Sequence, residues 1–159
     1  MLFRSTYMII TFCGHSNFQG FDKELKSKIL DAIKEATNDS YATFYLGGYG
    51  GFDSYALEVC KDYKKAHPAS SIVFITPYKD DSYLKDKHPL SLGYDEIIYA
   101  DIENTPKKYA IIARNKWMIM QSDLLIAYVD YFVGGAAKTL EFAKKQPGIK
   151  IINFGHLEN

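Results

Sequence analysis

Two glycine-rich turns, each between an apolar run and a helix-like stretch, constrain this sequence more than any other feature. The first is Tyr45-Leu46-Gly47-Gly48-Tyr49-Gly50-Gly51-Phe52-Asp53. The second, Gly134-Gly135-Ala136-Ala137-Lys138-Thr139-Leu140-Glu141, follows the apolar run 124–129. Glycine lets an anion approach main-chain N–H groups, and the first turn of a helix carries a positive partial charge. Two such turns in one sheet predict a ligand that carries phosphate, such as a nucleotide.

Short apolar runs alternate with helical patterns along the whole chain. The expected strands are 8–13, 43–46, 72–76, 96–100, 124–129 and 150–154. This alternation predicts an α/β fold: a Rossmann-like, doubly wound, mostly parallel sheet with helices on both faces. Ligands of such sheets bind at the carboxyl ends of the strands, so the site is expected there.

Four helices are expected between these strands. Phe21, Leu25, Ile29 and Ile33 recur every four residues and form the apolar face of the first helix. Asp53 is expected to cap the second, in which Ala56, Val59, Cys60 and Tyr63 share a face. Thr105-Pro106 is expected to start the third, which runs to about Gln121 and carries Ile112, Trp117 and Met120. The fourth is expected over 135–146, before Pro147-Gly148.

Length and charge limit the classes of function. A chain of 159 residues is expected to form one domain, 1–159. Its 19 basic and 19 acidic residues cancel, which argues against nucleic acid as a general partner. No apolar run is long enough to span a bilayer, so we expect a cytoplasmic protein without a membrane partner. Cys13 and Cys60 lack metal-site spacing, and we expect no metal and no cofactor.

The segment 77–94 is long for a connection in a small domain. It carries Tyr78, Lys79, Tyr83, Lys85, Lys87 and His88. Long connections are solvated loops or lids over a ligand site, and the sequence favours neither interpretation. As a lid, the segment would lie over or beside the carboxyl edge of the sheet and become ordered when ligand binds.

Three further positions are candidates for ligand contacts. Cys13-Gly14-His15-Ser16 follows the first strand, where a Rossmann-type ligand loop belongs, although the G-x-G-x-x-G pattern is absent. His15 and Ser16 are suited to donate to phosphate or ribose, and His15 is equally suited to a structural role. Arg114 suits a phosphate, and Glu141 suits acid–base chemistry on a glycosidic bond. Each of these two is also a common inert surface residue of helices.

Taken together, these segments resemble the SLOG superfamily over nearly the whole chain. The likeness rests on the stretches 11–16, 45–51, 114–118, 122–123 and 134–141 in their order along the sequence. That superfamily includes the LOG phosphoribohydrolases, the Smf/DprA proteins and the YpsA-like proteins. The chain is most similar to small YpsA-like members from Firmicutes and their phages. SLOG domains are associated with nucleotide signalling in bacterial defence.

The resemblance implies roles for particular residues. In LOG enzymes an Arg four positions before a Met and a Glu in P-G-G-x-G-T-x-x-E flank the glycosidic bond of a nucleoside monophosphate. Arg114 and Glu141 match these positions, as the catalytic pair if the protein is an enzyme. Val133 replaces the motif's proline, Ala137 its third glycine, and Lys138 displaces the threonine to Thr139. Phosphate binding tolerates these departures better than catalysis does.

Three hypotheses follow from the sequence. The first is binding of a nucleotide or an NAD- or ADP-ribose-derived signal without turnover, as a sensor or sponge. The second is a LOG-like phosphoribohydrolase, and the third is a nucleic-acid-associated protein similar to Smf/DprA, which the balanced charge disfavours. A homodimer or higher homo-oligomer is expected by analogy. The expected ligand-binding residues are Gly14, His15, Ser16, Gly47, Gly48, Tyr49, Gly50, Gly51, Arg114, Asn115, Gly134, Gly135, Ala136, Ala137, Lys138 and Thr139.

Overall fold

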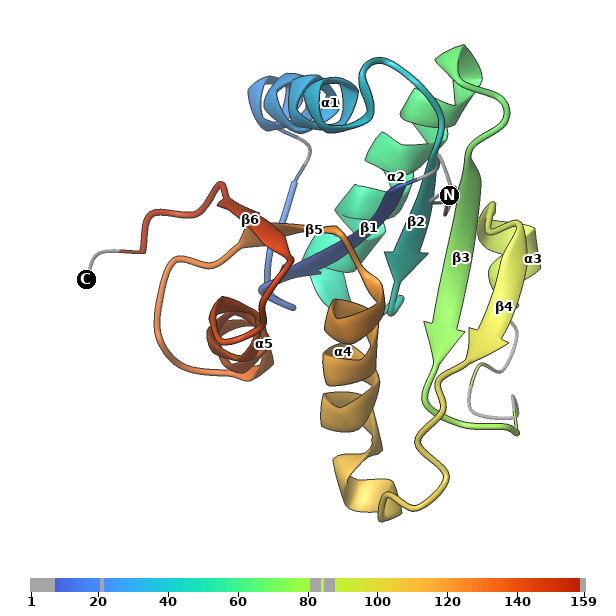
Figure 1. The fold of residues 1–159 in the computed structure, drawn as a ribbon, viewed down its shortest axis with the longest axis vertical. Coiled ribbons are helices and arrows are strands. Elements are labelled where there is room, and N and C mark those ends of the chain that lie inside the picture. Colours follow the sequence, from blue (N-terminus) through green and yellow to red (C-terminus); the bar gives the residue numbers. More distant parts are fainter. Residues whose placement is uncertain (1–7, 21, 81–83, 85–87, 158–159) are drawn as a thin grey trace, which may run out of the picture.

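Six parallel strands form one sheet in a computed structural model that describes residues 8–20, 22–80, 84 and 88–157. Their order across the sheet is β4-β3-β2-β1-β5-β6 (Figure 1). The strands are β1 (Met8–Gly14), β2 (Ala42–Leu46), β3 (Ser71–Thr76), β4 (Glu96–Tyr99), β5 (Leu124–Tyr128) and β6 (Lys150–Asn153). All five neighbouring pairs are parallel, which confirms the expected Rossmann-like α/β fold.

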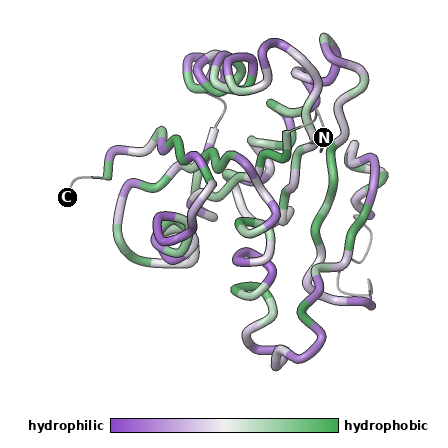
Figure 2. The backbone as a smooth tube through the Cα atoms, viewed as in Figure 1, coloured by the Kyte–Doolittle hydropathy of each residue, from purple (hydrophilic) through white to green (hydrophobic). Residues whose placement is uncertain are grey.

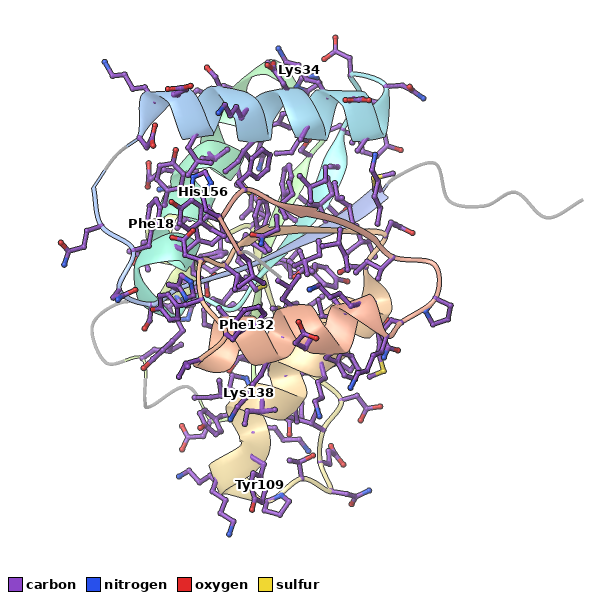
Figure 3. The ribbon with its side chains drawn as sticks, turned by 90° about the vertical axis from the view of Figure 1, so that its left-hand side faces the viewer. Phe18, Lys34, Tyr109, Phe132, Lys138 and His156 are labelled. Atoms are coloured by element: carbon purple, nitrogen blue, oxygen red, sulfur yellow. The ribbon has the colours of Figure 1, made fainter. Side chains whose placement is uncertain are left out.

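Helices cover both faces of this sheet. They are α1 (Lys23–Thr37), α2 (Gly50–Ala66), the short α3 (Pro89–Leu92), α4 (Ala110–Gln121) and α5 (Gly135–Lys144), with a 3-10 turn η2 (Lys107–Tyr109) before α4. α1 packs beside α2 and α4 packs beside α5, with the sheet between the two pairs (Figures 1 and 3). None of the helices in the described ranges is long and apolar enough to cross a membrane.

The strands are buried on both faces, as parallel sheets require. In β5, Leu124 and Ile126 join the core under α1 and α2, while Leu125 and Ala127 join the core under α5. Figure 2 shows β3 coloured as hydrophobic along its length. Leu25, Ile29 and Ile33 of α1 are buried in the first of these cores, so the expected apolar face is confirmed. Phe21 lies outside the described residues.

Two helix starts differ from the expectation. Asp53 does not cap α2, because the helix begins three residues earlier and Tyr49 occupies the N-cap. The Asp53 carboxylate instead reaches back, and its Oδ2 accepts a hydrogen bond from the Tyr49 N–H at 2.9 Å. After Thr105-Pro106 the chain first forms η2, and α4 begins only at Ala110.

The sheet reverses its order of growth between β1 and β5. From β1 the chain builds outward through β2 and β3 to β4, then returns through α4 to place β5 on the other side of β1. Loops that leave the carboxyl ends of β1 and β5 therefore diverge in opposite directions. In open α/β sheets a ligand crevice forms at this point.

Candidate functional site

A pocket opens where the sheet reverses, and we name it the switch-point pocket. Its cavity has a volume of about 180 Å³. Of the expected ligand-binding residues, it is lined by Gly14, His15, Ser16, Tyr49, Arg114, Asn115, Gly134, Gly135, Ala136 and Thr139. The lining residues that sequence reasoning did not assign to the site are Phe12, Cys13, Asp53, Ile111, Met118, Ile119, Tyr131 and Val133. Segments more than a hundred residues apart in sequence thus meet at one cavity.

Arg114 is buried in the wall of this pocket. Only 3% of the residue is exposed. Its Nη1 donates to the carbonyl oxygens of Gly47 at 3.0 Å and Ile75 at 2.9 Å, which lie at the carboxyl ends of β2 and β3. Its Nε donates to the side-chain oxygen of Asn115 at 2.9 Å. The guanidinium therefore ties two strand ends to α4, a structural role that the sequence did not predict, and it brings a positive charge to the pocket.

Asp53 is a carboxylate of the pocket that the sequence analysis treated only as a helix cap. It is half-buried in the first turn of α2. Burial raises its pKa to about 6, although the Tyr49 N–H and the Arg114 charge act in the opposite direction. A carboxyl whose pKa is perturbed by burial inside a pocket is a candidate functional group. Its place beside the first glycine turn was the only signal in the sequence.

His15 is held in one orientation by its neighbours. Its Nε2 accepts a hydrogen bond from the Asp130 N–H at 2.8 Å, and its ring stacks on Tyr131 with 3.8 Å between centroids. Burial lowers the pKa of His15, which outweighs the opposite effect of the Asp130 charge. Because Nε2 is an acceptor, the neutral ring carries its proton on Nδ1.

The N-terminus of α5 opens into the pocket without a capping side chain. Gly134 is the N-cap with φ 100°, a conformation that favours glycine, and the first turn contains no acidic residue. A Cβ atom added at Gly134 or Gly135 would find no protein atom within 4 Å. The main chain is therefore approachable there, and the helix dipole favours an anion at this end.

Three residues after this turn lie differently from the expectation. Ala137 is buried in the core under α5 rather than in the pocket lining. Lys138 is exposed and does not line the pocket (Figure 3). The Thr139 hydroxyl donates to the Gly135 carbonyl oxygen at 2.9 Å, within the helix. Thr139 thus lines the pocket, but its hydroxyl hydrogen is already donated to the main chain of its own helix.

The first glycine turn serves packing rather than an open anion cradle. The N–H of Gly51 donates to the Ser16 carbonyl oxygen at 2.8 Å, and the Tyr49 N–H is held by Asp53. A Cβ at Gly51 would lie 1.9 Å from the Phe18 carbonyl oxygen, and one at Gly50 would lie 2.6 Å from Ser16 Cα. Glycine is required there because α2 presses against the loop after β1. Of the two expected anion sites, the turn at 134–136 is the open one.

Glu141 does not face the pocket, so the expectation that it shares a cavity with Arg114 is wrong. Its carboxylate pairs with Lys144 at 3.2 Å, and both side chains are about half exposed. Glu141 lies two positions after Thr139, which does line the pocket. Because successive helix residues are about 100° apart, a shift of two positions turns a side chain to the opposite face.

Cys13 lines the pocket as an inert thiol. It is buried, and its Sγ lies 3.9 Å from the Ala136 carbonyl oxygen. Burial, and secondarily the Asp53 charge, raise the pKa of the thiol far above its usual range. A thiol that stays protonated is a poor nucleophile and metal ligand. Over the described ranges, no group of three or more His, Cys, Asp or Glu side chains is arranged to hold a metal ion.

The described part of the segment 77–94 lies beside other cavities. Tyr78 and Lys79 line a separate groove with Tyr99 and Glu103. His88 caps α3, and its Nδ1 accepts from the Leu90 N–H at 3.3 Å. Tyr83, Lys85 and Lys87 lie outside the described residues. The expected lid stays a prediction.

Comparison with known proteins supports the fold. No family model matches the chain. An uncharacterised SPbeta prophage-derived protein of Bacillus subtilis strain 168, YoqJ, is 29% identical over 140 residues, which covers 77% of this chain and 81% of YoqJ. The structure of DNA processing protein A from Helicobacter pylori aligns with a TM-score of 0.61 at 21% identity. That alignment covers 92% of this chain and 64% of the Helicobacter protein, so this chain spans less than two thirds of the length of that protein.

This structural neighbour also corrects one expectation. The balanced charge argued against nucleic acid as a partner, yet the Helicobacter protein is described by its single-stranded DNA binding mode. A protein with this fold therefore binds a nucleic acid, and the exclusion based on net charge is wrong. Net charge averages over the whole surface, whereas binding depends on charge at one site. The likeness to the Smf/DprA type is confirmed for the fold.

Proposed function

We propose that the switch-point pocket binds a nucleotide or a nucleotide-derived molecule, and that the chain is a small SLOG-type protein. The observation that carries the proposal is convergence: the loop after β1, Arg114 with Asn115, and the start of α5 meet at one cavity. Sequence reasoning selected all three segments separately. Pockets at the reversal point of an open α/β sheet are the usual ligand sites of this architecture.

The chemistry of the pocket suggests how such a ligand lies. A phosphate fits the uncapped N-terminus of α5 at 134–136, near the charge of Arg114. The cavity of about 180 Å³ is smaller than the roughly 300–1,000 Å³ of sites that enclose a whole ligand. The base would then rest outside it, where the exposed ring of Tyr49 offers a stacking surface.

Holding a ligand is favoured over cleaving it with Glu141. The phosphoribohydrolase hypothesis needs an acid–base group beside the glycosidic bond, and Glu141 points away from the pocket. A protein that binds a nucleotide-derived signal without turnover acts as a sensor or a sponge. Incubation with AMP and NAD, followed by chromatography for free base, tests the hydrolase alternative directly.

Calorimetric titration tests the proposal with AMP, ADP-ribose, NAD and a short oligothymidylate. The first three carry terminal phosphate or pyrophosphate, whereas the oligonucleotide presents phosphodiesters, so the ranking identifies the source of the phosphate. Gly135→Val places a branched side chain at the start of α5, where a Cβ atom meets no protein atom within 4 Å. We expect a folded variant that binds at least tenfold more weakly. Lys145→Val, at the far end of the same helix, is the matched control.

Three outcomes of these titrations distinguish the possible ligands and their site. Equal affinity of the wild type and a folded Gly135→Val protein would place the phosphate elsewhere. Absence of binding to all four ligands would refute the proposed function. Tight binding of the oligonucleotide alone would favour a nucleic-acid partner over a free nucleotide.

A further inference from the structure

Two opposite charges lie in the wall of the switch-point pocket. Asp53 comes from α2 and is half-buried, and Arg114 comes from α4 and is buried. The Tyr49 N–H holds Asp53 Oδ2 at 2.9 Å and so fixes the orientation of the carboxyl. Two carbonyl oxygens hold Arg114 in the same way. Neither charge is free to swing out of the pocket when a ligand arrives.

Groups from several other parts of the chain interact electrostatically with Asp53. The charge of Arg114 on α4 acts on Asp53. The charge of Asp53 in turn raises the pKa of Cys13 on β1 and of Tyr94 after α3. Cys13 in turn lies against Ala136 in the first turn of α5. That turn contributes no acidic residue. The charge of Asp130 also acts on His15 in the pocket, but of these two carboxylates only Asp53 lines the pocket itself.

The ionisation of Asp53 changes near neutral pH. Burial raises its pKa to about 6, in spite of the favourable Arg114 charge. When the carboxyl is ionised, its charge offsets that of Arg114 and repels an incoming anion. When it is protonated, Asp53 no longer offsets the charge of Arg114, and the carboxyl O–H becomes a hydrogen-bond donor. The protonated pocket is the better anion site.

We propose that Asp53 determines the charge selectivity of the switch-point pocket, so that an anionic ligand enters together with one proton on the Asp53 carboxyl. The inference rests on the proposed function, because it needs an anion in the pocket. The proton comes from solvent, and no bond of the ligand is broken. Asp53 is thereby a specificity-determining residue that favours ligands of low negative charge at neutral pH and admits more highly charged ones as the pH falls.

Calorimetry with ADP-ribose and sulfate tests the coupling, because neither probe changes its charge between about pH 5 and pH 8. Titrations run in two buffers with different ionisation enthalpies count the protons taken up on binding. Asp53→Asn keeps an acceptor for the Tyr49 N–H and removes the titration. Glu58→Gln is the control, since Glu58 lies on the same helix outside the switch-point pocket and pairs with Lys61.

We expect wild-type affinity to fall by up to about tenfold per pH unit above pH 6, with close to one proton taken up. Asp53→Asn should bind at about pH 8 as tightly as the wild type at about pH 5, with little proton uptake. Glu58→Gln should match the wild type. His15 is present in every variant, so its titration cancels in the comparison.

Two results would overturn the inference. If the wild type and Asp53→Asn bind with the same pH dependence and the same proton uptake, the proposed function survives and the role of Asp53 fails. If the wild type binds neither probe at about pH 5, the proposed function fails first. A ¹³C NMR titration of the Asp53 carboxyl adds an independent readout, because bound sulfate should raise its pKa.

Discussion

Gly47 lies directly against the guanidinium group of Arg114. A Cβ atom at position 47 would stand 2.8 Å from Arg114 Cζ, and the Gly47 carbonyl oxygen accepts from Arg114 Nη1 at 3.0 Å. The two residues are 67 positions apart in sequence. The first glycine of the turn after β2 and the arginine of α4 are therefore one structural unit, and each explains the presence of the other.

Gly47→Ala should destabilise the protein and disturb the pocket together. The new methyl group meets a guanidinium fixed by two carbonyl oxygens, so overpacking is expected to cost about 1–3 kcal/mol of unfolding free energy. Urea denaturation measures the loss. Gly135→Ala is the matched control, because its Cβ meets nothing within 4 Å and its stability should change by less than about 0.5 kcal/mol. Equal midpoints for both variants would show that Arg114 moves freely.

Arg114→Ala should lower stability as well as ligand affinity. It leaves the carbonyl oxygens of Gly47 and Ile75 without this donor and removes the positive charge near Asp53. Loss of a buried charged donor costs about 2–4 kcal/mol of unfolding free energy. Lys116→Ala, an exposed position of the same helix, should change it by less than about 0.5 kcal/mol. An Arg114→Ala protein as stable as the wild type would restrict Arg114 to ligand binding.

Glu141→Ala should leave both ligand affinity and stability nearly unchanged. Its carboxylate makes one partly exposed pair with Lys144, and such pairs contribute about 0–1 kcal/mol. Calorimetric titration and urea denaturation measure the two quantities. Release of free base by the wild type but not by Glu141→Ala would establish the hydrolase and contradict the position of Glu141 described above.

Asp53 should make folding stability depend on pH in the acidic range. Its pKa of about 6 in the folded protein exceeds the ordinary value of 3.8, so the folded state binds more protons between these pH values. The contribution of Asp53 to the free energy of unfolding is therefore greatest below about pH 4. It falls by roughly 3 kcal/mol as the pH rises to about 6. The difference between the wild type and Asp53→Asn isolates this slope. A constant difference over that range would mean that Asp53 has an ordinary pKa in the folded state.

The segment 77–94 should change its hydrogen exchange when ligand binds. Gly48 and Tyr49 line a groove together with Leu84, Pro89, Leu92 and Tyr94, which places part of the segment next to the proposed stacking ring. Mass spectrometry with and without saturating ADP-ribose measures the amide exchange of this segment, and α1 serves as the internal reference. Slower exchange confined to the segment supports a lid. Identical rates with ligand bound would exclude it.

The fold was predictable because it depends on local pattern. Apolar runs placed each strand within one or two residues, and the order of strands and helices allowed few arrangements other than a parallel sheet. Asp22 capping α1, through the Leu25 N–H at 3.0 Å, is the same kind of local signal. The short helix α3 and the late start of α4 were not predictable, because tertiary packing overrides the weak preferences of short segments.

For the site, the sequence by itself determined which segments carry glycine and histidine after the strands and which helix carries the arginine, and it predicted the edge of the sheet where they meet. Only the tertiary structure decided which side chains face the pocket. Asp53 faces it and Glu141 does not, because a rotation of about 100° per helix residue turns a small shift in register into a change of face. The structure also decided that one glycine turn is packed and the other open, since close packing depends on which atoms a Cβ would meet, and those atoms come from distant parts of the chain.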